Sequence, residues 1–132
     1  MHIAILGAGR VGTTLGRRFT EAGHSVTYGV RTPDDAKHAG LRVADMADAC
    51  AHAELVLLCT PWAAAESAIT AAGDLRGKVL VDATNPIGPG MVLTHGTTDS
   101  GAEQVARWAT GARVVKAFNS VGMEVMADPV FG

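Results

Sequence analysis

The sequence predicts an α/β fold with a doubly wound parallel sheet, and three observations support this prediction. Strand-like apolar runs alternate with helix-like amphipathic runs along the chain. The central runs 55–58 and 79–81 are apolar at every position, which is typical of strands covered on both faces. Gly23 and Gly73 follow predicted helices, as glycines that end helices do. Right-handed crossovers between such strands give a parallel sheet with helices on both faces.

The first strand and the first helix are predicted from the N-terminal part of the chain. An apolar run over residues 2–6 predicts the strand, and a helical pattern follows over residues 10–22. Val11, Leu15 and Phe19 recur at intervals of four residues, so one apolar stripe of this helix can pack on the sheet.

The remaining elements continue the same alternation. Further strands are expected over residues 25–30, 41–43, 55–59, 79–82 and 113–118. Further helices are expected over residues 33–39, 45–51, 62–72, 101–109 and 120–126. The length suits one domain over residues 1–132 and leaves no room for a separate substrate domain.

A glycine-rich motif lies directly between the first predicted strand and helix. It reads Gly7-Ala8-Gly9-Arg10-Val11-Gly12. In this position a GxGxxG pattern is the fingerprint of a Rossmann-type NAD(P)-binding domain, whereas a structural tight turn is the alternative. The first glycine permits a sharp turn, the second lets bare backbone approach a pyrophosphate, and the third lets the helix lie close to the strand. The pyrophosphate would then lie at the N–H groups that begin the helix.

Composition and charge exclude several other functions. Eleven basic and thirteen acidic residues give a formal net charge of −2, which is not the charge of a nucleic-acid binder. No apolar stretch approaches the length of a membrane span, and the chain enters its first strand without a signal peptide, so a cytoplasmic protein is expected. Cys50 and Cys59 lack metal-ligand spacing, as do the histidines, and no metal site is expected. Cys59 is interpreted as a small core residue.

Arg31 predicts which dinucleotide is bound. An NAD site usually carries an acidic residue at the end of the second strand, where it binds the ribose 2′-hydroxyl. Here the strand end is followed by Arg31, and the first acidic residues are Asp34 and Asp35. A guanidinium offers a 2′-phosphate two parallel donors, whereas a carboxylate would repel it. Thr32 adds a further donor, so NADP(H) is predicted in preference to NAD(H).

Five motifs in this order resemble the NADP-dependent oxidoreductases that use the deazaflavin coenzyme F420. They are the glycine motif, Gly29-Val30-Arg31, Cys59-Thr60-Pro61-Trp62, Asp82-Ala83-Thr84-Asn85-Pro86 and Val115-Lys116-Ala117-Phe118-Asn119. The resemblance covers essentially the whole chain. A related nucleotide-binding module occurs in metalloreductases and pyrroline-5-carboxylate reductases, so the motifs are less specific for the electron acceptor than for the cofactor.

The resemblance implies a set of cofactor-binding residues. Residues Ala8 to Val11 would line the pyrophosphate, and Val30 and Arg31 would hold the 2′-phosphate. Thr60, Pro61 and Trp62 would lie along the ribose and nicotinamide, and Asn85 and Pro86 would face the reacting side. Val30 replaces a hydroxyl-bearing residue common in the family, and Lys37 is the nearest following cation. Family members usually continue well beyond residue 132, so three interpretations are open: a natural short form, a domain without its C-terminal portion, or a protein whose partner subunit completes the site.

Other candidate residues have two interpretations each. Trp62 stacks near the nicotinamide or only begins a helix after Pro61. Asn119 binds the nicotinamide carboxamide or caps the helix expected over 120–126. His95 is a proton donor to an imine or carbonyl substrate or, as we expect, polar surface. Asp82 and Lys116 end adjacent strands and either form a buried or half-buried ion pair or have a functional role. Met123 and Met126 mark a packing face or a dimer contact.

Two functions of different classes follow from these observations. The first is an oxidoreductase that transfers a hydride between NADP(H) and a deazaflavin or flavin-like acceptor, which needs orientation of two rings and no catalytic residue of the chain. The second is a non-catalytic NADP(H)-binding, redox-sensing module that acts through a partner. An imine or oxo-acid reductase is a third class, but it would need an additional helical domain. An exposed last strand also predicts a homodimer.

Overall fold

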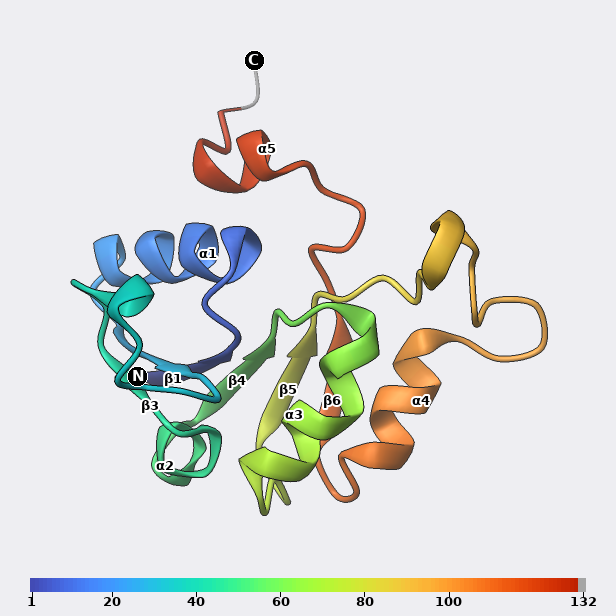
Figure 1. The fold of residues 1–132 in the computed structure, drawn as a ribbon, viewed down its shortest axis with the longest axis horizontal. Helices are drawn as coiled ribbons and strands as arrows, with labels where there is room; N and C mark the ends of the chain where they lie inside the picture. The colour runs from blue at the N-terminus through green and yellow to red at the C-terminus, as the bar shows by residue number, and fades with distance from the viewer. Residues whose placement is uncertain (131–132) are drawn as a thin grey trace.

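A computed structural model of the protein describes residues 1–130, and its centre is a six-stranded sheet (Figure 1). The strands are β1 (His2–Leu6), β2 (Ser25–Gly29), β3 (Val43–Ala44), β4 (Leu55–Leu58), β5 (Val79–Asp82) and β6 (Arg113–Lys116). They lie in the order β3-β2-β1-β4-β5-β6, and every neighbouring pair is parallel. This is the doubly wound order of a Rossmann-like fold, in which the strand order reverses between β1 and β4.

Helices connect the strands and cover both faces of the sheet. The α-helices are α1 (Arg10–Glu21), α2 (Met46–Ala51), α3 (Ala65–Ala72), α4 (Gly101–Trp108) and α5 (Met123–Ala127). Short 3₁₀ turns are η1 (Ala36–His38), η2 (Trp62–Ala64) and η3 (Pro89–Met91). In Figure 1, α1 and α5 lie on one side of the sheet, and α2, α3 and α4 lie on the other. Among residues 1–130, no helix has the length and apolar character that a membrane crossing requires.

Each face of the sheet has its own apolar core. Ile3, Ile5 and Leu57 point to the face that α1 and α5 cover, where they pack with Leu15 and Met126. A larger core on the opposite face combines residues from β1, β4 and β5 with α2, α3 and α4. Because side chains alternate along a strand, these buried strands supply both cores at once, which accounts for their continuous apolar sequence. Met126 therefore confirms the predicted packing face of the last helix.

Several predicted bounds were wrong. The helix expected over 33–39 is only the three-residue turn η1, which Asp35 caps by accepting from Lys37 N and which ends at His38. The helix expected over 62–72 divides at Ala64 (φ −106°, ψ 0°), which ends η2 and is the N-cap of α3. The helix expected over 120–126 begins at Met123 instead. The strand expected over 41–43 pairs with β2 only at Val43 and Ala44.

Three strands end earlier than predicted. The runs expected over 25–30, 55–59 and 113–118 stop at Gly29, Leu58 and Lys116. The last of these cannot continue, because Phe118 adopts a φ of 67° and turns the chain away from the sheet. The prediction that two glycines end helices is confirmed. Gly23 (φ 86°) and Gly73 (φ 75°) take positive φ angles after α1 and α3.

Candidate functional site

The predicted cofactor-binding residues follow the carboxyl ends of five parallel strands, so the fold gathers them at one edge of the sheet. Gly7 N donates to Gly29 O at 3.0 Å, which joins the loops after β1 and β2. A Cβ added to Gly7 would lie 3.1 Å from Cys59 O, which places the loop after β4 against the same turn. In a doubly wound sheet this edge, near the reversal of strand order, is where ligands bind.

The three glycines of the motif have three different surroundings. Gly7 has a φ of 103°, which an L side chain rarely adopts. A Cβ on Gly12 would lie 2.2 Å from Gly7 O, so the first turn of α1 packs directly on the preceding backbone. A Cβ on Gly9 would meet no protein atom within 4 Å. The predicted turn at Gly7 and close approach at Gly12 are confirmed, and the backbone at Gly9 is open to a ligand.

The N-terminus of α1 is free to bind an anion. Its first helical hydrogen bond runs from Thr13 N to Gly9 O at 2.9 Å, which leaves the N–H groups of Arg10, Val11 and Gly12 without a helical acceptor. No side chain caps this terminus, and no acidic residue lies in its first turn. The helix dipole and these donors therefore face the open backbone at Gly9.

Thr60 supplies an independent sign of a ligand on the opposite side of the Gly7 turn. Its Cγ2 would lie 3.3 Å from a Cβ on Gly7, so its side chain lies against the glycine loop. Within residues 1–130, Thr60 Oγ1 is a buried side-chain oxygen that has no hydrogen-bond partner. Because a buried hydroxyl normally finds a partner, this oxygen and the open backbone at Gly9 fit the polar groups of a dinucleotide.

Neighbouring Cys59 offers no reactive group to this site. Burial, and secondarily the carboxylate of Asp82, raise the pKa of its thiol to about 12. The side chain packs against the core on the α1 face. The interpretation of Cys59 as a core residue is confirmed, because a thiol that remains protonated near neutral pH is a poor nucleophile.

Arg31 lies just beyond β2, exposed at the same edge as the glycine turn. Among the described residues it forms no ion pair, while Asp35 binds Lys37 Nζ at 2.7 Å. Hydrogen bonds and the charge of Lys37 hold the pKa of Asp35 below its usual range. Asp35 is therefore engaged by Lys37, and the guanidinium of Arg31 is available. Val30 is buried and contributes packing, while Thr32 is exposed beside Arg31.

A polar network joins the ends of β5 and β6. Asp82 is fully buried, and its Oδ2 accepts from Lys116 Nζ at 2.9 Å, so the two residues form the ion pair that was one of their two interpretations. Its Oδ1 accepts from the backbone N–H and the hydroxyl of Thr84, at 2.9 and 2.7 Å. Thr84 was not predicted as a site residue, although an Asp-x-Thr sequence directly after a buried strand is the pattern of such a side-chain turn.

Beyond this network, Asn85 and Asn119 meet across the two loops. Asn85 Nδ2 donates to Asn119 O at 3.1 Å. The prediction that Asn119 caps the next helix was wrong, because α5 begins after Gly122 and no side chain caps it. Pro86 lies next to Asn85 and packs against Gly101, the first residue of α4.

The ring of Trp62 turns toward α4. It lies 5.3 Å from the ring of Trp108 and 5.4 Å from that of His95, measured between ring centroids. Trp62 also begins η2 directly after Pro61, as one of its two interpretations predicted. His95 Nδ1 lies 3.1 Å from Thr94 Oγ1.

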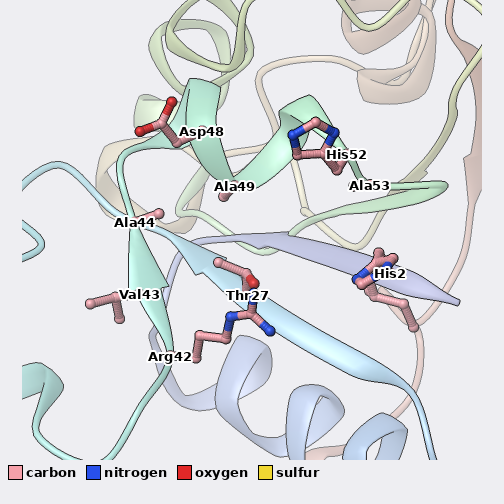
Figure 2. Close-up of a pocket in the computed structure, with 10 residues that line it drawn as sticks. His2, Thr27, Arg42, Val43, Ala44, Asp48, Ala49, His52 and Ala53 are labelled. Carbon is pink, nitrogen blue, oxygen red and sulfur yellow. The ribbon is translucent and has the colours of Figure 1, made fainter.

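A cavity of about 490 Å³ lies away from these residues (Figure 2). Figure 2 shows Asp48 and His52 of the α2 segment on one side of it, and His2, Thr27 and Arg42 on the other. His2 begins β1, so the cavity opens toward the amino ends of the strands. None of the predicted cofactor-binding residues lines it.

Comparisons with known proteins agree with this geometry. Residues 2–86 match the family described as NADP oxidoreductase, coenzyme F420-dependent. The chain is 31% identical to the F420-dependent NADP reductase of Methanothermobacter marburgensis, over 97% of this chain and 67% of that protein. A crystal structure from Arthrobacter sp. FB24, provisionally named an F420-dependent NADP reductase, is 39% identical with a TM-score of 0.88. That match covers 98% of this chain and 67% of the other.

More distant structures share the fold and contain the cofactor. A reductive aminase from Aspergillus terreus in complex with NADPH and ethyl levulinate is 28% identical, with a TM-score of 0.63. The match covers 86% of this chain and 38% of that enzyme. The chain thus spans about two thirds of the length of its reductase relatives. By fold, motif and sequence, it belongs to the family of coenzyme F420-dependent NADP oxidoreductases and is an NADP-dependent oxidoreductase.

Proposed function

We propose that the chain binds NADP(H) at the edge formed by the carboxyl ends of its strands and directs a hydride between the nicotinamide and a deazaflavin or flavin-like acceptor. The observation that carries this proposal is the uncapped start of α1 against the open backbone of Gly9. The names of the reductase relatives support coenzyme F420 as the acceptor.

Each part of the cofactor would have its own set of residues. The N–H groups at the start of α1, with Ala8 and Gly9, would hold the pyrophosphate. Arg31 and Thr32 would bind the 2′-phosphate, and Val30 would support them from the core. Thr60 Oγ1 would donate to or accept from the ribose–nicotinamide half, with Pro61 and Trp62 shaping the same loop. Asn85, Pro86 and Asn119 would border the nicotinamide.

The chain's contribution to the reaction is orientation. Bound NADPH supplies the hydride. The protein would hold the donor and acceptor rings in a fixed relative orientation, without forming a covalent bond to either. The neutral thiol of Cys59 and the paired carboxylate of Asp82 add no free charge beside the rings. We therefore assign no catalytic acid, base or nucleophile among the residues of this site.

An anaerobic titration tests the proposed reaction. NADPH is added while the fluorescence of the two tryptophans is followed, and oxidised F420 is then added while its visible absorbance is followed. Protein-dependent loss of that absorbance is expected. Binding of NADPH without loss of absorbance would overturn the hydride transfer and favour a redox-sensing module. Absence of NADPH binding would overturn the assignment of the site.

Substitution of Arg31 tests the choice of dinucleotide. Arg31→Gln removes the guanidinium, so the affinity for NADPH should fall by about tenfold or more while the affinity for NADH stays unchanged. Arg17→Gln is the matched control, because Arg17 is an exposed arginine of α1 that pairs with Glu21 at 3.9 Å. Equal loss of NADPH and NADH affinity in Arg31→Gln would contradict a contact with the 2′-phosphate.

We also propose that the chain forms a homodimer. β6 is an outer strand of the sheet, and Val115 at its centre is 47% exposed. An exposed apolar edge strand is a surface that a second copy can cover. Light scattering should give twice the monomer mass, and Val115→Lys should reduce it to the monomer mass. A monomer at micromolar concentration before substitution would contradict this proposal.

A further inference from the structure

We propose that Asp82, Thr84 and Lys116 are positioning residues that set the nicotinamide-facing wall of the site. This inference rests on the proposed NADP(H) binding. It concerns one half of the bound dinucleotide, and the three residues act through Asn85 and Asn119 without touching the cofactor themselves.

The network closes on itself around a buried carboxylate. Asp82 is 0% exposed, and its two oxygens accept three hydrogen bonds, two from Thr84 and one from Lys116. Lys116 Nζ also donates to Thr84 O. Each residue therefore contacts both others, so the end of β5, the turn after it and the end of β6 are fixed as one unit.

This unit lies where the two loops that carry Asn85 and Asn119 leave the sheet, so it can set the position of both loops. Asp82 and Lys116 are register partners at the carboxyl ends of adjacent strands. One residue after Thr84 the chain reaches Asn85, and three residues after Lys116 it reaches Asn119. The hydrogen bond from Asn85 Nδ2 to Asn119 O then links the two loops directly above the network.

The backbone between Lys116 and Asn119 shows that this loop is held in place. Ala117 N still donates to Asp82 O at 3.2 Å, which extends the strand pairing by one residue. Phe118 then takes a φ of 67°, although it is not glycine. Such a conformation persists only where the surroundings enforce it. The ion pair on one side and the Asn85 contact on the other supply that constraint.

A plain structural role would affect the whole site, whereas a positioning role affects one half of the cofactor. The two are distinguished by the dissociation constants of NADPH and of adenosine 2′,5′-bisphosphate, which has the 2′-phosphate but lacks the nicotinamide. In Thr84→Val the hydroxyl is lost while the ion pair remains. We expect the dissociation constant of NADPH to rise about tenfold, a cost that small misplacements can reach. That of the bisphosphate should stay within about twofold, as for a distant independent site.

Lys116→Met is the stronger variant, but it leaves a buried carboxylate without its partner and can prevent folding. If Lys116→Met does not fold, Thr84→Val alone tests the positioning role. Arg113→Met is the matched control, because Arg113 lies at the other end of β6 and donates to Gly77 O. It should change neither dissociation constant.

Each outcome has a distinct meaning. A rise for NADPH alone in Thr84→Val, with Arg113→Met unchanged, supports the positioning role. Equal rises for both ligands, or none, overturn that role and leave the proposed NADP(H) site intact. If the unsubstituted chain binds neither ligand, the proposed function fails and this inference fails with it.

Discussion

The starts of α1 and α4 lie at the same edge of the sheet but differ in nearly every contact. α1 begins three residues after β1, its N-cap is Gly9, and no side chain caps it. α4 follows a long loop after β5, and its N-cap Ser100 forms a complete capping box with Glu103. Ser100 Oγ accepts from Glu103 N at 3.2 Å, and Glu103 Oε2 accepts from Ser100 N at 2.6 Å.

The difference shows where the fold leaves binding capacity unused. α4 satisfies the N–H group of Glu103 with the Ser100 hydroxyl and places the Glu103 carboxylate at its positive dipole end, so its start is less suited to bind an anion. α1 leaves its first N–H groups unsatisfied beside a glycine whose surroundings are open. With glycine as its N-cap, α1 gives up only a few tenths of a kcal/mol of capping energy, and it retains a site for a ligand instead.

The largest effect is expected at Gly12. In Gly12→Ala the new methyl would lie 2.2 Å from Gly7 O, a backbone atom that cannot move without breaking the turn. The free energy of unfolding should fall by about 3 kcal/mol, and the melting temperature by about 10 °C. Thermal denaturation followed by circular dichroism measures both.

Gly101→Ala at the start of α4 is the matched control for Gly12→Ala. There the methyl would meet only the ring of Pro86, at 3.1 Å and beyond. Its effect on the free energy of unfolding should stay below about 1 kcal/mol, because the better helix propensity of alanine offsets the tighter packing. Similar losses in the two variants would mean that close packing at Gly12 is not special.

The second effect is expected on binding. In Gly9→Ala the backbone can stay as it is, since Gly9 has a φ of −81° and a Cβ meets no protein atom within 4 Å. The melting temperature should change little, while the dissociation constant of NADPH should rise about tenfold because the methyl fills the space of the pyrophosphate. Fluorescence titration measures the second quantity. Unchanged NADPH affinity would place the pyrophosphate elsewhere.

The parts of the fold that depend on residues close together in the sequence were predictable from it. The first strand agrees to the residue, and the turn at Gly7 and the close approach at Gly12 follow from local chemistry. The segment 33–39 was predicted as a helix from its place between two apolar strand candidates. Its residues are mostly exposed and bury no apolar stripe, so only a single turn forms.

Parts of the candidate site depend on contacts between distant segments and could not be predicted. The ring of Trp62 turns to Trp108 of α4, far along the chain, where the two rings pack together. Phe118 looks like a strand residue by composition, but pairing with β5 ends just before it. The Asp-x-Thr turn of Thr84 has a local signal, but the bonds from Lys116 that close the network depend on the pairing of β5 with β6.

The smallest effect is expected at Ser100. There the stability should fall and the NADPH affinity should stay unchanged, which is the opposite of the result expected at Gly9. Ser100→Ala removes the cap of α4, so the free energy of unfolding should fall by about 1 kcal/mol. The affinity for NADPH should not change, because the α4 start is occupied by its own capping box and the Glu103 carboxylate. Denaturant unfolding and the same fluorescence titration check the two quantities. If Ser100→Ala weakened NADPH binding as much as Gly9→Ala, both helix starts would belong to the site, and the division between a closed and an open helix start would be wrong.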